Sequence, residues 1–284
     1  MSAVASREIP LRESALLQPR PKRRSWTRLI LPTYTAIVIV YLMVPIFVMI
    51  IFGFNNTHGR FNLVWQGFTL SWYQNLFAIP DLTTSLINSL VIGVSATAVS
   101  TVLGTMIALA LDRYAFPGKS ALNLTLFLNI AAPEIVMGAT LLALFIQLQI
   151  PQGLLTIFLA HVMFIMAYVT VTVRARLAGF DRSLEEAAQD LGAPPLITFR
   201  KVTLPLIFPG IMAGALLAFA LSIDDFVTTY FVAGSVNTFP LWVYGATREG
   251  VPPQVNVMGT LIFAGGVLLA LLNVAYQRRA AKLQ

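Results

Sequence analysis

The sequence predicts an all-α membrane protein with six transmembrane helices. Hydrophobic residues make up 57% of the 284 residues, charged residues make up only 11%, and the mean hydropathy is +0.77. A soluble domain carries about 25% charged residues, so this composition indicates several membrane spans. Six apolar runs reach the roughly 20 residues that a spanning helix needs. These runs are 31–54, 86–111, 121–146, 154–173, 206–233 and 255–276.

The first 28 residues precede these spans and differ from them in composition. They contain seven basic residues and three prolines. We expect residues 1–28 to form a disordered cytoplasmic tail that lies against anionic lipid, followed by one six-span domain over residues 29–284. A cleaved signal peptide is the alternative. It is disfavoured because the next apolar run is too long and ends at Asn55 without a small-residue cleavage pattern.

Helix breakers and small residues occur inside the predicted spans. Pro133 interrupts the third span and Pro209 the fifth, which a membrane helix tolerates when its neighbours satisfy the freed backbone groups. Gly210 and Gly214 lie four residues apart at the start of the fifth span. This spacing places two small residues on one helix face and predicts close contact with another helix.

The basic residues predict the orientation of the chain. Of the 19 lysines and arginines, 17 fall in the N-terminal tail, in residues 112–120, in residues 174–205 or at the C-terminus, and only Arg60 and Arg248 lie on the opposite side. The positive-inside rule therefore predicts that both termini and residues 174–205 are cytoplasmic. The same spread argues against nucleic-acid binding as the reason for the net charge of +7, because the charges flank the membrane spans.

Residues 174–205 form a polar loop between the fourth and fifth spans. Ser183 followed by Glu186 matches a capping box, which predicts that a helix begins near Leu184. Apolar residues then recur at helical spacing and give this helix one apolar face. They are Leu184, Ala187, Ala188 and Leu191.

The same loop contains the signals that end this helix. Gly192 can adopt the left-handed conformation typical of a helix end, and Pro194 and Pro195 prevent continuation. The predicted helix is about two turns long. A helix that short is marginally stable in water, so we expect it to be stabilised by packing against a partner protein.

The loop also carries a resemblance to a known family. Glu186-Ala187-Ala188, Gly192 after three residues and Val202-Thr203-Leu204-Pro205 after nine more resemble the signature loop of permease subunits of binding-protein-dependent type I ABC importers. Val202 is the one departure, since the family more often has Ile there. A chance helix-turn is the alternative. The resemblance implies a coupling helix that contacts the ATPase through Ser183, Leu184, Glu185, Glu186, Ala187, Ala188, Leu191, Gly192, Leu204 and Pro205.

The same resemblance implies the rest of the assembly. Its members would be two ATPase subunits, a second, homologous permease subunit and an extracytoplasmic solute-binding protein. ATP and magnesium would be bound by the ATPase partner, with no cofactor and no metal site in this chain. The protein would be a multi-pass subunit of the cell membrane and would not itself be an enzyme.

The residues agree that this chain lacks the chemistry to drive transport alone. Gly118-Lys119-Ser120 imitates the end of a nucleotide-binding loop, but Arg113 occupies the position of the first glycine. There is no cysteine, and no nucleophile–base pair or metal-ligand spacing is present. His161, inside the fourth span, either relays protons, as in ion-coupled carriers, or makes a helix–helix hydrogen bond.

Three acids lie within the predicted spans: Glu134 in the third, and Asp224 and Asp225 in the fifth. Each costs roughly 2.5–3.5 kcal/mol to insert, so an intramembrane acid is a candidate for function. No lysine or arginine lies inside the predicted spans, so we expect these acids to line a path for a cationic cargo in the outer half of the bilayer. Phe226 and Tyr230 could offer aromatic faces to an amine. The structural alternative is a neutral, hydrogen-bonded Glu134 and aspartates that order a loop.

Two segments sharpen the resemblance. Residues 221–226 (LSIDDF) and 133–137 (PEIVM) resemble segments of spermidine/putrescine importer permeases, and the likeness extends from about residue 30 onward. It implies a polyamine cargo. Permeases for ferric iron, sulfate or sugars share the coupling loop and remain alternatives. An ion-coupled secondary transporter that uses Glu134, His161 and the aspartates is a further alternative, but it would need no ATPase dock, and a non-transport scaffold would need no intramembrane acids.

Overall fold

The computed structural model describes residues 27–59 and 61–282, so the predicted tail lies outside the described residues except for its last two. The chain divides into two compact units, residues 1–47 and residues 48–284. Helix α1 (Thr27–Phe52) begins in the first unit and ends in the second. Its apolar side chains are mostly exposed, as expected of a helix that faces lipid or another subunit.

Within the described residues, the regular structure of the second unit consists of helices. In chain order they are α2 (Ser71–Gln74), α3 (Pro80–Arg113), α4 (Lys119–Ala131), α5 (Glu134–Gln147), α6 (Leu154–Leu177), α7 (Ser183–Asp190), α8 (Pro195–Thr198), the π-helix η2 (Phe199–Thr203), α9 (Leu204–Asp224), α10 (Val227–Val232), α11 (Phe239–Glu249) and α12 (Pro253–Lys282). Among described residues, five helices are long and apolar enough to cross a membrane, and a sixth span results if α4 and α5 count as one. The predicted six-span architecture is confirmed.

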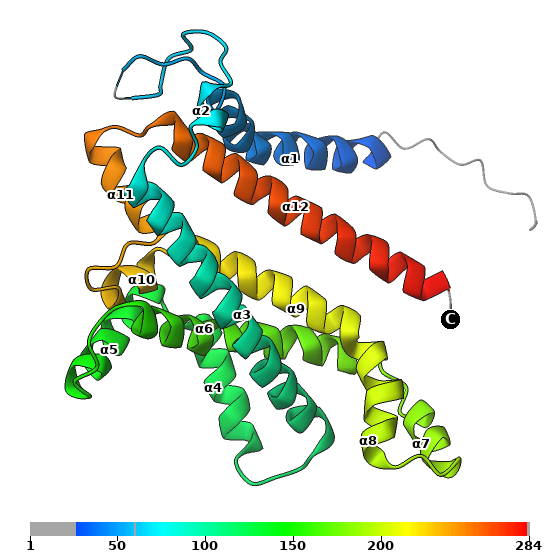
Figure 1. Cartoon of the computed structure of the whole chain (residues 1–284). Coiled ribbons are helices and arrows are strands. Elements are labelled where there is room, and N and C mark those ends of the chain that lie inside the picture. The colour runs from blue at the N-terminus through cyan, green and yellow to red at the C-terminus, as the bar shows by residue number, and fades with distance from the viewer. Residues whose placement is uncertain (1–26, 60, 283–284) are drawn as a thin grey trace, which may run out of the picture. The chain divides into compact units, whose positions relative to one another are not determined.

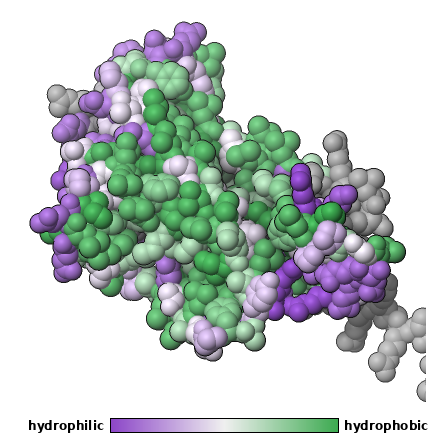
Figure 2. Space-filling model, turned by 60° about the horizontal axis from the view of Figure 1, so that its bottom comes forward, coloured by the Kyte–Doolittle hydropathy of each residue, from purple (hydrophilic) through white to green (hydrophobic). Residues whose placement is uncertain are grey.

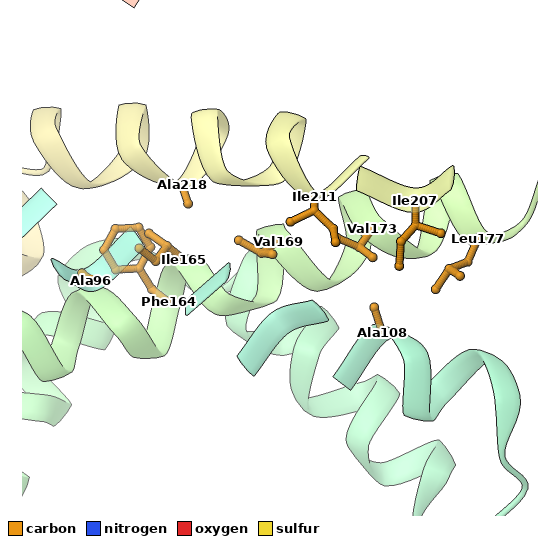
Figure 3. Packing of buried hydrophobic residues seen from close by; sticks show 10 residues of the cluster. All are labelled: Ala96, Ala108, Phe164, Ile165, Val169, Val173, Leu177, Ile207, Ile211 and Ala218. Carbon is orange, nitrogen blue, oxygen red and sulfur yellow. The ribbon is translucent and has the colours of Figure 1, made fainter. Parts of the chain in front are cut away.

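Three long helices, α3, α6 and α9, pack against one another and form the core (Figure 1). Figure 3 shows Ile207 and Ile211 of α9 directed toward Val173 and Leu177 of α6, with Ala108 of α3 beside them. Small residues allow this close approach. A Cβ atom added at Gly214 would lie 3.4 Å from the Val169 side chain of α6, so the predicted small-residue face does contact another helix.

The third predicted span is not one straight helix. The axes of α4 and α5 differ by 111°, and the break falls at Ala132 and Pro133. Ala132 is extended, with φ −67° and ψ 137°, as the residue before a proline prefers. The prediction of a single span over 121–146 is therefore wrong in its geometry, although the two halves cover nearly the same residues.

The fifth predicted span also ends differently. Helical backbone runs from Pro195 through α8 and η2 to the end of α9 at Asp224, and the predicted continuation to residue 233 is interrupted at Asp225. Asp225 has extended φ and ψ of −62° and 119°, and α10 begins two residues later. Residues of both breaks line one cavity, so together the breaks position the candidate site.

The surface has the polarity expected of a membrane protein. Figure 2 shows a face that is largely apolar, with hydrophilic residues gathered at its margins. Large apolar side chains are exposed along α3, α4 and α12, among them Val94, Phe127 and Leu268. These side chains would be unfavourable in water and are accounted for by lipid or by neighbouring subunits.

Candidate functional site

The three predicted acids lie around a single cavity of about 330 Å³, where the α4–α5 break faces the α9–α10 break. The cavity is lined by residues from α4, the α4–α5 break, α5, α6, α9, the α9–α10 break and α10. They are Asn129, Ile130, Ala132, Glu134, Met137, Phe164, Tyr168, Leu221, Asp224, Asp225, Phe226, Val227 and Thr228.

The helix breaks explain why these acids can occur in an apolar chain. Glu134 is the first residue of α5 and Asp224 is the last residue of α9, so neither lies in a helix interior. Both side chains are exposed in the single subunit. About 20 residues of α9 at 1.5 Å per residue separate Asp224 from the 174–205 loop, a length of roughly 30 Å. The acids therefore lie at the opposite end of α9 from that loop.

Asp225 has a different environment from Asp224. Its carboxylate oxygen Oδ2 accepts hydrogen bonds from the backbone N–H of Thr229 at 2.8 Å and from the Thr229 hydroxyl at 2.6 Å. The same oxygen lies 3.3 Å from Nε2 of His161, and both side chains are almost completely buried. The sequence offered no lysine or arginine within the spans as a partner for these acids. The structure instead places a histidine, His161, beside Asp225.

His161 joins α6 to the second helix break. Nδ1 lies 2.7 Å from the Ser222 hydroxyl of α9, and Nε2 lies 2.9 Å from the Thr229 hydroxyl of α10. The side chain is buried at 1% exposure. Because both ring nitrogens have side-chain partners, the helix–helix hydrogen-bond interpretation is favoured over a proton relay.

The two predicted aromatic residues separate in the structure. Phe226 lines the cavity and contacts Tyr244, with ring centroids 4.7 Å apart. The Tyr230 ring centroid lies 5.8 Å from that of Phe226, but Tyr230 is not among the lining residues and its side chain is 61% exposed. The structure thus brings Glu134, Asp224, Asp225 and Phe226 together and leaves Tyr230 at their edge.

Sequence reasoning missed two uncharged polar residues in the cavity. Among the described residues, Oδ1 of Asn129 and Oγ1 of Thr228 are buried without a hydrogen-bond partner, and both residues line the cavity. A buried polar atom without a partner is costly, so these two atoms are sites of unmet hydrogen bonding beside the cavity. An asparagine within an otherwise apolar run was the available signal, but the sequence argument considered only ionisable groups.

The 174–205 loop contains the predicted short helix, α7, which has the expected length of about two turns. The predicted capping box is wrong. Ser183 is already helical, and its backbone N–H donates to Asp181 Oδ1 at 3.0 Å. This backbone hydrogen bond, with a second from the Ser183 hydroxyl, holds the pKa of the Asp181 carboxyl below its usual value. Gly192 has φ +84°, the left-handed conformation predicted for the helix end.

Most of α7 is exposed, and its predicted contact residues fall into two groups. Leu184 and Glu186 are exposed, and Leu191, which follows the helix, is 90% exposed. Glu185 and Ala188 are half-buried against the rest of the chain. Leu204 and Pro205 begin α9, where Leu204 is half-buried and Pro205 is exposed. A short helix with an exposed apolar face in this position has the features of a docking element.

Spanning helices around an acidic cavity, together with an exposed amphipathic helix on a polar loop, are the features of a membrane transport protein. Comparison with known proteins assigns the family. Residues 22–282 match the family described as "Binding-protein-dependent transport system inner membrane component". The chain belongs to this family, and it is therefore a multi-pass membrane protein and a transport subunit of the type I ABC importer permease class.

The relatives that match over most of the chain are permease proteins. The spermidine/putrescine transport system permease protein PotC of Haemophilus influenzae is 39% identical over 244 residues, covering 86% of this chain and 94% of that protein. The putrescine transport system permease protein PotI of Escherichia coli K12 is 37% identical over 250 residues, covering 85% and 88%.

Solved structures support the same fold. A bacterial ABC transporter involved in the import of the acidic polysaccharide alginate has a TM-score of 0.62 at 18% identity and covers 92% of this chain and 99% of its own. The alginate transporter in complex with its pentasaccharide-bound periplasmic protein gives 0.64 at 14% identity, with coverages of 92% and 96%. At these identities the likeness concerns the fold alone, and it confirms the predicted permease architecture.

Proposed function

We propose that this chain is one of two permease subunits that form the translocation path of an ATP-driven importer of polyamines such as spermidine or putrescine. An extracytoplasmic binding protein delivers the cargo, and a dimer of ATPase subunits binds ATP and magnesium and docks on α7. ATP-driven closure of that dimer then moves the coupling loop and switches the helices between outward- and inward-open arrangements.

The acidic cavity carries the cargo assignment. Glu134 and Asp224 are exposed to it, and none of the described residues that line it is a lysine or arginine. A polyamine is a flexible chain of ammonium donors separated by methylenes, which matches carboxylates and acceptors set among apolar walls. The names of the relatives support the same class of cargo.

The alternative cargoes fit this cavity less well. A sulfate ion would meet two exposed carboxylates and would be repelled. Ferric iron and sugars remain alternatives that the shared coupling loop allows, and a competition assay separates them from polyamines. The ion-coupled alternative is disfavoured because it does not account for the exposed apolar face of α7.

The proposed orientation places both termini, the 112–120 loop and the coupling loop in the cytoplasm, as the basic residues predict. The absence of cysteine makes this simple to test. A cysteine introduced at Asp190 should react with a membrane-impermeant maleimide only when the cytoplasmic face is accessible, and one at Glu249 only from the outside. The reverse labelling pattern would show that the orientation is opposite to the proposed one.

The test of the cargo assignment is uptake of labelled spermidine and putrescine by vesicles that contain the complete importer. Asp224→Asn and Glu134→Gln should each reduce uptake about 5- to 150-fold, because each removes one charged contact worth about 1–3 kcal/mol. Asp81→Asn, an exposed acid away from the cavity, is the matched control. Native uptake rates in both cavity variants, or no competition by unlabelled polyamine, would refute the assignment.

A further inference from the structure

A cluster of polar contacts joins the first turn of α7 to α3 and η2. Docking of an ATPase on the exposed face of α7 would not itself require these contacts. Arg113, the last residue of α3, donates from Nη2 to Oε1 of Glu185 on α7. The hydroxyl of Thr203, at the end of η2, donates to the same oxygen. Nη2 of Arg113 also lies 3.5 Å from that hydroxyl. One carboxylate oxygen therefore links α3, α7 and the π-turn that leads into α9.

These three side chains are largely protected from solvent. Glu185 is 15% exposed and Arg113 is 27% exposed, while Thr203 is completely buried. An ion pair shielded in this way is screened much less by salt than a pair in open water. Each charge also suits its own helix, since a carboxylate favours a helix N-terminus and a guanidinium favours a C-terminus.

The far end of α3 contacts the segment that follows the acidic cavity. The Asn88 side chain donates to the Asn237 carbonyl at 2.9 Å, and the backbone N–H of Phe239 donates to the Ser89 hydroxyl at 2.9 Å. Both contacts reach the chain just beyond α10. About 24 residues separate Ser89 from Arg113, which is roughly 36 Å of continuous helix. A single helix thus spans the distance from α7 to the neighbourhood of the cavity (Figure 1).

Close packing makes α3 a stiff connection over this distance. A Cβ atom added at Gly104 would lie 2.8 Å from the Val169 Cβ of α6, so the two helices are in direct contact there. Ala96 and Ala108 are completely buried in the same core. A displacement applied at Arg113 would therefore be carried along α3 and its packing partners rather than absorbed by side-chain motion.

We propose that Arg113, Glu185 and Thr203 form an internal joint that converts movement of α7 into movement of α3, and through α3 into movement beside the acidic cavity. In this role Glu185 faces inward as a positioning residue, while Glu186 remains available to the ATPase. The inference rests on the proposed function, because it assumes that an ATPase moves α7. It predicts that breaking the joint uncouples ATP hydrolysis from transport while the ATPase stays bound.

A second ion pair between the same segments supplies the matched control. Arg182 donates to Oδ2 of Asp112 at 3.0 Å, and Asp112 is the residue before Arg113 on α3. The Arg182 side chain, however, is 60% exposed. A solvated pair of this kind contributes little. Arg182→Glu makes a charge reversal of the same size on the same loop, so it separates the joint from a general effect of surface charge.

The experiment uses the complete importer, with both permease subunits, ATPase and binding protein, reconstituted in proteoliposomes loaded with ATP. Three readouts are taken: ATPase retention on purification, hydrolysis stimulated by loaded binding protein, and cargo uptake per ATP hydrolysed. Arg113→Glu and Glu185→Arg should each retain the ATPase but lower uptake per ATP about 5- to 150-fold, the usual range of a coupling between sites. Arg182→Glu should lower it less than Glu185→Arg does.

The double exchange Arg113→Glu/Glu185→Arg is the decisive variant, because it restores the ion pair with the charges reversed. Recovery of most of the uptake per ATP supports the joint; recovery is incomplete because each charge then opposes its helix dipole. The joint is overturned if the single variants transport normally, if they lose the ATPase, or if the exchange recovers nothing although the complex assembles. Stimulated hydrolysis without polyamine uptake in the unmodified importer would refute the cargo assignment alone.

Discussion

Asp224 and Asp225 are adjacent in the sequence, yet they have opposite environments in the structure. Asp224 is exposed to the cavity, whereas Asp225 is buried against His161 and Thr229. Successive side chains on a helix point about 100° apart, so the sequence predicts that at least one of the two faces a cavity or a partner subunit. Both aspartates line the cavity, and the helix break at Asp225, which could not be read from the sequence, decides which carboxylate is exposed to it.

This difference predicts separate consequences for the two aspartates. Asp225→Asn should lower the unfolding free energy of the purified complex by about 1–3 kcal/mol, because a buried charged acceptor with two hydrogen bonds is lost. Thermal unfolding in detergent measures this. Asp224→Asn, the matched control, should leave stability unchanged while it reduces uptake. An unchanged unfolding temperature in Asp225→Asn, together with lost uptake, would show that Asp225 acts on cargo instead.

A double-mutant cycle assigns the Asp225–His161 contact. His161→Ala should also destabilise the complex, because the Ser222 and Thr229 hydroxyls lose their partner. If the pair acts as one unit, the double variant should cost less than the sum of the two single variants by about 0.5–3 kcal/mol. Additive losses would mean that the two residues stabilise the break independently.

At the scale of the elements, the sequence predicted where apolar helices occur but not where they break. Pro32, Pro45 and Pro209 lie inside continuous helices, whereas Pro133 marks a 111° change of direction. The presence of a proline therefore does not by itself determine whether a helix continues or breaks. The outcome depends on whether neighbouring elements can receive the two halves. Here α5 packs on α10, a tertiary contact that hydropathy does not report.

The end of α7 gives a prediction that isolates backbone geometry. Gly192 has φ +84°, and its N–H donates to the Gln189 carbonyl at 2.8 Å. Gly192→Pro fixes φ near −65° and removes this donor, so it should abolish coupled uptake. Gly192→Ala adds a Cβ that meets nothing within 4 Å and costs only about 1–2 kcal/mol of backbone strain. This variant should therefore lose only a modest part of its coupled uptake.

Gly118 provides the control for this prediction. It has φ +91° and equally open surroundings, but it lies in the turn before α4. Gly118→Ala therefore carries the same backbone cost without altering α7, and uptake per ATP hydrolysed should stay at the native value. Equal effects of Gly118→Ala and Gly192→Ala, or normal uptake in Gly192→Pro, would contradict a specific role for the end of α7.

The close contact between α3 and α6 predicts that replacing a glycine by alanine lowers stability at this contact but not at an open position of another helix. Gly104→Ala would place a Cβ 2.8 Å from the Val169 side chain and 3.0 Å from the Met166 carbonyl, which should destabilise the complex by about 1–3 kcal/mol. Gly266→Ala in α12 meets nothing within 4 Å and should be neutral or stabilising by up to about 1 kcal/mol. Thermal unfolding compares the two, and equal shifts would mean that α3 and α6 are not in close contact.

At the scale of the whole molecule, charge and chemistry are segregated along the bundle. The 112–120 and 174–205 segments, which the basic residues assign to one side, meet through Arg113 and Glu185. The acids lie at the other end of α9, some 30 Å away. Composition and charge predicted this polarity because orientation depends only on where residues fall along the chain. The convergence of three acids on one cavity depends on two helix breaks, so it required the structure.

This segregation predicts how the importer is energised. His161 is buried and has a side-chain partner at each ring nitrogen, and Asp225 accepts a hydrogen bond from the Thr229 hydroxyl. The residues that an ion-coupled carrier would require therefore do not form an open proton path. Uptake should therefore persist when an ionophore collapses the proton gradient at constant internal ATP. It should stop when the ATPase partner carries a hydrolysis-blocking substitution and the gradient is intact. Both arms are measured as initial uptake rates in the same vesicles. Uptake that follows the gradient and ignores ATP would reverse the assignment and make the buried His161–Asp225 pair a proton relay.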